Sequence, residues 1–199
     1  MDAYDIVREC LIDNLDPYNN NLIIGNSLGG AFTFKFCMEN PAFAQRAVLI
    51  SPAGAPFPTT AEDVIRPFMA KTFGDACKII ERIWTNPKMS NYVIAPLLIR
   101  TAAQPGFQSM LESIISIDQD PNGPLAQMLF SPQDLQNFPV PALFIWGDQD
   151  HVLPMEMRDY FDAHLPTSVP RIFPSDLGHC PHYENPSFVA QMIKQWMNS

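Results

Sequence analysis

The sequence predicts an α/β protein, in which a parallel sheet of about four strands with flanking helices is interrupted by a helical cap insertion. Short apolar runs of the kind buried on both faces of a parallel sheet occur in residues 1–54 and 132–199. Helical patterns separate these runs, and such alternation is typical of a parallel sheet with helices on both faces. Residues 55–131 differ, because they carry helical patterns broken by proline and glycine and no strand pattern.

The N-terminal part predicts two helices that alternate with two strands. Apolar residues recur at helical spacing near the start, and Asp16-Pro17 with the asparagines after it forms a turn. The second helix is expected to end at Asn40-Pro41, because the residue before a proline avoids helical conformation. The expected elements are a helix over 2–15, a strand over 22–24, a helix over 28–39 and a strand over 47–50.

The rest of the chain predicts the insertion and the second half of the sheet. The insertion has candidate helices over 61–73, 76–85, 90–103, 107–117 and 124–130. After it come strands over 141–146 and 171–173 and a closing helix over 186–197. Open parallel sheets bind ligands at the carboxyl ends of their strands, so we expect residues 55–131 to form a cap over that edge and residues 1–54 and 132–199 to form the core.

Composition excludes several classes of partner. The chain has 199 residues, enough for one domain, and a net charge of −9 with no basic cluster. Neither a nucleic acid nor an anionic membrane surface is therefore an expected partner. No apolar run is long enough for a membrane span, and no signal-peptide pattern opens the sequence, which favours the cytoplasm. The four cysteines, at positions 10, 37, 77 and 180, are widely spaced and are expected to be reduced thiols.

A serine between glycines stands where the first strand must turn into a helix. The segment Gly25-Asn26-Ser27-Leu28-Gly29 has the G-x-S-x-G pattern of a nucleophile elbow, in which a strained turn lifts the serine hydroxyl above the sheet. We expect Gly25 and Gly29 to be required because a side chain at either position would collide with the strand or the helix. The N–H of Leu28 is the candidate oxyanion donor, although the pattern also occurs in ordinary small-residue loops.

A serine nucleophile needs a base and an acid that holds the base. His179 follows the last strand in a loop after Gly178 and is the preferred base, with His182 in reserve; His164 is expected on a surface helix. Asp148 and Asp150 both follow the third strand, where Asp148 has the simpler role of a turn residue after Gly147. The order of serine, aspartate and histidine is that of an α/β-hydrolase triad.

Three segments together resemble the α/β-hydrolase superfamily. They are "LIIGNSLGG" around Ser27, "LFIWGDQDHVLP" around Asp150 and "DLGHCPHYENP" around His179. The second resembles the acid loop of that family, in which the aspartate three residues after the glycine is catalytic, and this favours Asp150 over Asp148. The third resembles its Gly-His loop followed by Glu-x-Pro. The resemblance implies that this chain is the C-terminal portion of an α/β-hydrolase fold with a cap.

The resemblance implies hydrolysis of a carboxylic ester by Ser27, His179 and Asp150, without metal or organic cofactor. Residues 55–131 are rich in Met, Phe, Ile and Leu, which either pack the helices of the cap or line an apolar pocket, and a small to medium, mostly apolar substrate is expected. The form of the elbow, with Ser51-Pro52-Ala53-Gly54 after the next strand, also resembles hydrolases that cleave C–C bonds in meta-cleavage products. Dehalogenase and epoxide-hydrolase activities are disfavoured because they need an aspartate at the position of Ser27. A non-catalytic hydrolase-like fragment or binding domain stays a further alternative.

The sequence also departs from the family pattern. Members usually carry four more strands before the elbow, together with a loop that supplies a second oxyanion N–H, and no His-Gly-Gly segment occurs here. We therefore expect this chain to be a portion of a longer protein. The strand over 22–24 is then expected to be an unpaired apolar edge, through which the chain could associate with a partner.

Overall fold

The computed structural model describes residues 3–56, 64–85, 90–117 and 128–199, and its centre is a parallel sheet of four strands. The strands are β1 (Leu22–Asn26), β2 (Arg46–Ile50), β3 (Ala142–Ile145) and β4 (Arg171–Ile172), in the spatial order β1-β2-β3-β4. Their register pairs Ile24 with Val48 and Val48 with Leu143. The prediction of an α/β fold with about four parallel strands is confirmed.

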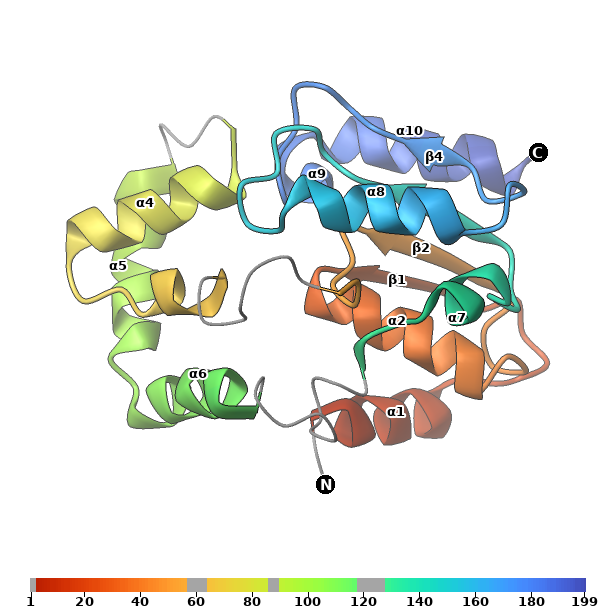
Figure 1. Ribbon diagram of the computed structural model, residues 1–199, viewed down its shortest axis with the longest axis horizontal. Coiled ribbons are helices and arrows are strands. Elements are labelled where there is room, and N and C mark those ends of the chain that lie inside the picture. Colours follow the sequence, from red (N-terminus) through yellow and green to blue (C-terminus); the bar gives the residue numbers. More distant parts are fainter. Residues whose placement is uncertain (1–2, 57–63, 86–89, 118–127) are drawn as a thin grey trace.

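Helices cover both faces of the sheet. Figure 1 shows α2, α7 and α8 in front of the strands and α10 behind them, with α1 alongside α2. Within the described residues the helices are α1 (Ala3–Asn14), α2 (Leu28–Glu39), the 3₁₀-helix η1 (Arg66–Phe68), α4 (Phe73–Ile83), α5 (Ser90–Ala102), α6 (Pro105–Ile117), α7 (Pro132–Gln136), α8 (Met155–His164), α9 (Pro181–Glu184) and α10 (Pro186–Met197).

Alternate residues of the central strands enter two different cores. Leu49 and Phe144 pack on the side of α2 and α8, where Phe34 stacks on Phe138 with ring centroids 4.5 Å apart. Their neighbours along the strands pack on the opposite side against α10; these are Val48, Ile50, Leu143 and Ile145, with Val189 of α10. The strands are continuously apolar because both faces of the sheet are buried.

The insertion forms a helical group with a core of its own. Its buried residues include Ala76 and Ile80 of α4 and Ala95 of α5. Figure 1 shows α4, α5 and α6 lying off the carboxyl ends of the strands. None of the described residues of the insertion forms a strand, as expected. The boundaries of the cap at residues 55 and 131 stay a prediction.

Two helices of the insertion differ from the sequence expectation. The helix expected over 61–73 is wrong in its second half, because the chain leaves η1 at Met69 and α4 begins at Phe73. Thr72 and Asp75 form a capping box, in which the Thr72 hydroxyl accepts the Asp75 N–H at 3.1 Å and the Asp75 carboxylate accepts the Thr72 N–H at 2.9 Å. The helix expected over 124–130 lies mostly outside the described residues.

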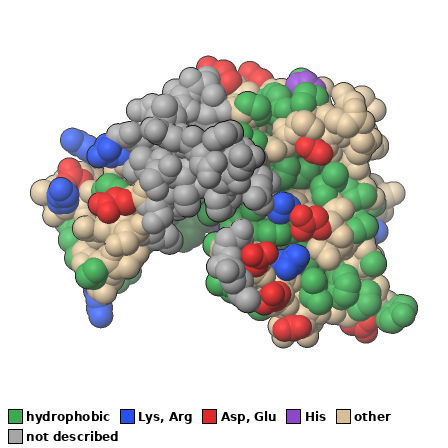
Figure 2. Space-filling view, turned by 60° about the horizontal axis from the view of Figure 1, so that its bottom comes forward, with side chains coloured by type: hydrophobic (Ala, Val, Ile, Leu, Met, Phe, Trp, Pro, Cys, Tyr) green, Lys and Arg blue, Asp and Glu red, His purple; other side chains and the backbone are tan. Residues whose placement is uncertain are grey.

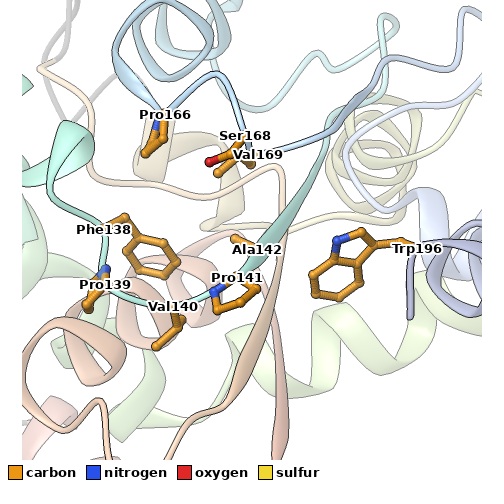
Figure 3. Close-up of a pocket in the computed structure, with 9 residues that line it drawn as sticks. All are labelled: Phe138, Pro139, Val140, Pro141, Ala142, Pro166, Ser168, Val169 and Trp196. Carbon is orange, nitrogen blue, oxygen red and sulfur yellow. The ribbon is translucent and has the colours of Figure 1, made fainter. Parts of the chain in front are cut away.

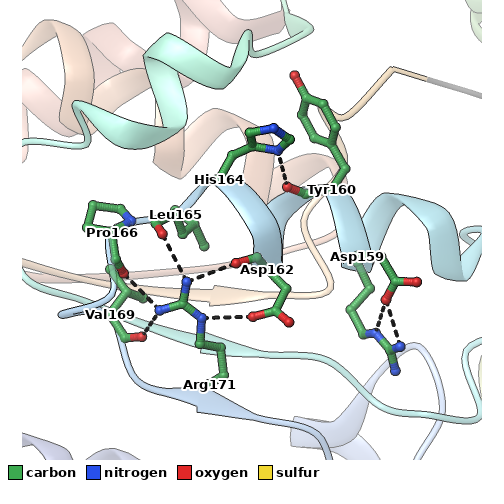
Figure 4. A network of polar contacts seen from close by, with 9 residues as sticks. Asp159, Tyr160, Asp162, His164, Leu165, Pro166, Val169 and Arg171 are labelled. Atoms are coloured by element: carbon green, nitrogen blue, oxygen red, sulfur yellow. Dashed lines mark hydrogen bonds and ion pairs between the residues drawn. The ribbon is translucent and has the colours of Figure 1, made fainter.

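Arg171, at the start of β4, joins this strand to the end of α8 (Figure 4). Its guanidinium donates to the carboxylate and the carbonyl of Asp162, at 2.9 and 3.0 Å, and to the carbonyls of Leu165 and Pro166, at 2.9 and 2.8 Å. It also donates to the carbonyl of Val169. The last carbonyl groups of a helix have no N–H partner within the helix. By donating to several of them, the Arg171 side chain fixes the turn from α8 into β4.

β1 pairs with β2 on one side and lies at the edge of the described sheet, as expected. Ile24 is 50% exposed there, although the facing Val48 is fully buried. On the face shown in Figure 2, Lys and Arg side chains stand singly or in small groups among acidic and apolar ones. No helix among the described residues is long and apolar enough to cross a membrane.

Candidate active site

Ser27 forms a one-residue turn between β1 and α2. Its φ and ψ are 55° and −123°, a conformation that costs a residue other than glycine on the order of 1–3 kcal/mol. Three backbone hydrogen bonds hold it: the Ser27 N–H donates to Ile50 at 3.0 Å, and its carbonyl accepts from Ala31 and Ala53 at 3.1 and 3.0 Å. The Ser27 hydroxyl does not cap α2.

Leu28 is the first residue of α2, so its N–H has no acceptor within the helix. The partial positive charge of a helix N-terminus adds to the attraction of this N–H for a negatively charged oxygen. The role of the Leu28 N–H as oxyanion donor, directly after Ser27, stays a prediction.

The glycines around the elbow have different roles. A Cβ on Gly25 would lie 2.2 Å from the carbonyl oxygen of Gly29, and a Cβ on Gly30 would lie 2.8 Å from the ring of Pro52. Gly25 and Gly30 therefore let β1 and the loop after β2 approach α2. The expectation of a collision at Gly29 is wrong, because a Cβ built there has no heavy atom of the described residues within 4 Å, apart from its chain neighbours and the nearby backbone of α2. Gly29 lies at the exposed start of α2.

We expect opposite effects from alanine at the two neighbouring glycines of α2. Gly30→Ala should destabilise the fold by roughly 1–3 kcal/mol, because its methyl group would overlap Pro52. Gly29→Ala should be neutral or stabilise by up to ~1 kcal/mol, since alanine favours helix and has room. Urea unfolding of the two variants and the unsubstituted chain measures both effects. Equal destabilisation by the two substitutions would contradict this assignment.

A buried acid–base pair lies at the carboxyl ends of β3 and β4. The Nδ1 atom of His179 is 2.8 Å from Oδ2 of Asp150, and both residues are 5% exposed. The other oxygen of Asp150 accepts the N–H groups of Val152 and Leu153 at 2.8 and 3.0 Å. This carboxylate is therefore held from both sides, and with a proton on Nδ1 of His179 the Nε2 atom is left as the basic nitrogen.

The structure separates the alternatives that the sequence left open. Asp148 forms an ion pair with Arg158, whose Nη1 lies 2.7 Å from Oδ1, and it is not the partner of His179. His182 lies at the surface with its ring partly covered, and this partial loss of solvent, followed by the nearby His179, lowers the pKa of His182. His164 lies on α8 with its ring nitrogen 2.8 Å from the carbonyl oxygen of Tyr160.

The elbow and the histidine loop are joined by Asn26, a residue that the sequence reasoning did not select. Its amide donates to the carbonyls of Ile50 and His179, at 3.1 and 3.0 Å. The residue beside Ser27 is thus bonded directly to the backbone of the candidate base. No hydrogen bond joins the side chains of Ser27 and His179 themselves among the described residues, and such bonds are often long until a substrate is bound.

Cys180 follows His179 and lies beside the same amide, with its sulfur 3.5 Å from Oδ1 of Asn26. Burial, with smaller contributions from the Asp150 and Glu184 carboxylates, raises the pKa of Cys180 to about 12. A thiol with this pKa is neutral near pH 7 and a weak nucleophile. Cys180 is therefore not a candidate nucleophile. The three other cysteines are also unpaired.

The acid and base loops touch at Gly147. A Cβ at this position would lie 2.2 Å from the carbonyl oxygen of Gly178 and 2.3 Å from that of Leu177. The Gln149 N–H also donates to Leu177 at 3.0 Å. A glycine at the end of β3 thus allows the close contact that brings Asp150 to His179. The sequence analysis noted Gly147 only as the residue before Asp148 and did not predict this contact.

A hollow of about 310 Å³ lies at the opposite, amino-terminal end of the sheet (Figure 3). It is lined mainly by apolar side chains, among them Phe138 before β3, Val169 before β4 and Trp196 of α10. None of the candidate catalytic residues reaches it. Across the described part of the chain, no group of three or more His, Cys, Asp or Glu side chains is placed to hold a metal ion.

Comparison with known proteins identifies a family and relatives that match most of the chain. The family model described as the alpha/beta hydrolase family matches residues 2–192. The chain is 23% identical over 175 residues to 2-hydroxymuconate semialdehyde hydrolase of Pseudomonas putida, covering 88% of this chain and 61% of that protein. The chain thus spans less than two thirds of the length of this curated relative.

Two solved structures share the fold. One is a variant of a meta-cleavage product hydrolase (CumD), with a TM-score of 0.80 and 19% identity, which covers 100% of this chain and 73% of that one. The other is a serine hydrolase from the polyaromatic hydrocarbon-degrading bacterium Cycloclasticus zankles, with a TM-score of 0.80 and 20% identity, covering 98% of this chain and 70% of that one. At this identity the likeness concerns the fold.

Proposed function

The chain belongs to the α/β hydrolase family, and we propose that it carries the triad of a serine hydrolase that cleaves a carboxylic ester of a small to medium, mostly apolar substrate. The observation that carries this proposal is the buried pair of His179 and Asp150, 2.8 Å apart, joined through Asn26 to the strained turn at Ser27. Backbone strain and a buried acid–base pair are features that surroundings maintain at functional sites.

The proposed reaction follows from these positions. His179 accepts the Ser27 proton through Nε2 while the serine oxygen attacks the ester carbonyl, and Asp150 stabilises the imidazolium that forms. The N–H of Leu28 donates to the developing oxyanion. His179 then returns the proton to the leaving alcohol and later activates the water that hydrolyses the acyl-enzyme. No metal or organic cofactor takes part in this scheme.

Cleavage of a C–C bond in a meta-cleavage product is the second candidate. It is favoured by the names of relatives, which include 2-hydroxymuconate semialdehyde hydrolase and a meta-cleavage product hydrolase. The proposed triad would serve both reactions, so the two differ in the substrate and in the groups that bind it. Apolar side chains of the insertion, such as Phe68 and Phe107, are candidates for that part of the site.

Two assays on the purified chain test the proposal. We expect a fluorophosphonate to add once, at the peptide that contains Ser27, and p-nitrophenyl acetate to be hydrolysed faster than in buffer. Faster turnover of a 2-hydroxy-6-oxo-dienoate would instead favour the C–C hydrolase. A folded chain with no adduct and no turnover of either substrate would contradict both proposals and favour a hydrolase-like binding domain. In that case, association through the exposed β1 edge would be examined by sedimentation.

A further inference from the structure

Glu184, in the short helix α9, forms hydrogen bonds to two segments that are far from each other in the sequence. One carboxylate oxygen, Oε1, accepts the N–H of Gly178 at 2.7 Å, directly before His179. The other, Oε2, accepts both the N–H and the hydroxyl of Thr85, at 2.8 and 2.6 Å. Thr85 lies two residues after the end of α4. Charge-assisted bonds of this kind are stronger than bonds between neutral groups.

The end of α4 also contacts the candidate base directly. The N–H of His179 donates to the carbonyl of Ile83, the last residue of α4, at 3.1 Å. A Cβ at Gly178 would lie 2.9 Å from this carbonyl oxygen and 3.0 Å from Oε1 of Glu184. Glycine at this position therefore lets the histidine loop fit between the helix end and the carboxylate.

Aromatic packing strengthens the same junction. Trp84, between Ile83 and Thr85, stacks on Tyr183, the neighbour of Glu184, with ring centroids 4.7 Å apart and planes 20° apart. Backbone, carboxylate and ring contacts thus join the end of α4 to the segment from Gly178 to Glu184. The loop of the base is held on one side by Asp150 and Asn26 of the core and on the other by the insertion.

We propose that Glu184 is a positioning residue, which locks the His179 loop to the end of α4 so that the insertion sets the place of the catalytic base. This inference rests on the proposed function of His179. Its physical reason is that the carboxylate bridges Gly178, directly before His179, and Thr85, two residues after the end of α4. Without that bridge, His179 keeps its bond to Asp150 but loses a constraint on its backbone, and small displacements of a catalytic group are costly.

Substitutions that remove the bridge in steps test the proposal. Glu184→Ala removes all three bonds, Glu184→Gln keeps one carbonyl oxygen as an acceptor, and Thr85→Val removes the hydroxyl but keeps the Thr85 N–H. Glu81→Gln, on the exposed side of α4, is the matched control for the change of charge. With p-nitrophenyl acetate we expect kcat to fall on the order of 10- to 100-fold in Glu184→Ala, with KM nearly unchanged. Glu184→Gln and Thr85→Val should lie between this variant and the control.

A second measurement does not depend on turnover. The proton between His179 and Asp150 is expected to give a far-downfield proton resonance, which should broaden or shift in Glu184→Gln and stay unchanged in Glu81→Gln. An unchanged resonance together with unchanged kcat in folded Glu184→Gln and Thr85→Val variants would overturn the positioning role. If the unsubstituted chain shows the resonance but no turnover, the proposed function fails while the response of the resonance still decides the role of Glu184.

Discussion

Alanine in place of Ser27 should abolish fluorophosphonate labelling and lower ester hydrolysis by about 10⁴-fold or more. Ser27 carries the only hydroxyl of the segment from Gly25 to Gly29, so in the proposed mechanism its loss leaves the His179–Asp150 pair without a nucleophile to activate. Intact-mass spectrometry of the labelled protein and the initial rate with p-nitrophenyl acetate measure the two effects. The fold should persist, because the Ser27 side chain does not cap α2.

Ser168→Ala is the matched control for this experiment. It makes the same chemical change at an exposed serine before β4, at the amino-terminal end of the sheet. Labelling and rate should equal those of the unsubstituted chain. An adduct that survives in Ser27→Ala, at any other residue, would show that a different nucleophile reacts.

Asparagine in place of Asp150 should lower kcat/KM by about 10³–10⁴-fold. The neutral amide cannot stabilise the His179 imidazolium, and it can hold the ring in the wrong tautomer by donating to Nδ1. The N–H groups of Val152 and Leu153 now bonded to Oδ1 can still bond to an amide oxygen. We therefore expect a large loss of rate with a small change in the urea midpoint.

Asp148→Asn provides the control within the same loop. Asp148 pairs with Arg158 at 2.7 Å, and its side chain is 33% exposed, so loss of this ion pair should cost about 1 kcal/mol or less of stability. The rate should change by less than about threefold, because Asp148 makes no bond to His179. A larger loss of rate in Asp148→Asn than in Asp150→Asn would reverse the assignment of the acid.

Much of the fold follows from local patterns. The apolar runs of β2 and β3 have few alternatives to burial on both faces of a sheet, and the ends of α2 coincide with Ser27 and Asn40 as expected. The helix expected over 61–73 is wrong in its second half, because a local capping signal there ends one segment and begins another. The capping box of Thr72 and Asp75 starts a new helix there.

The candidate site was accessible to sequence reasoning because its residues occur in ordered motifs at strand ends. The carboxyl ends of parallel strands meet at one edge, so the order of Ser27, Asp150 and His179 was sufficient to predict that they converge. The role of each residue in catalysis stays a prediction. The choice between Asp148 and Asp150 came from a family resemblance, since both follow β3, and the structure distinguishes them by their partners Arg158 and His179.

The sequence by itself determined the order of elements and the parallel sheet, because these depend on periodicity and on residues adjacent in the chain. The candidate residues came from local motifs together with the family resemblance. Only the tertiary structure decided which groups touch across large separations. It showed that Gly30 has the close neighbour expected for Gly29, and that Glu184 bridges Thr85 and Gly178. Such contacts depend on how segments distant in the chain approach within a few ångströms, which no local pattern encodes.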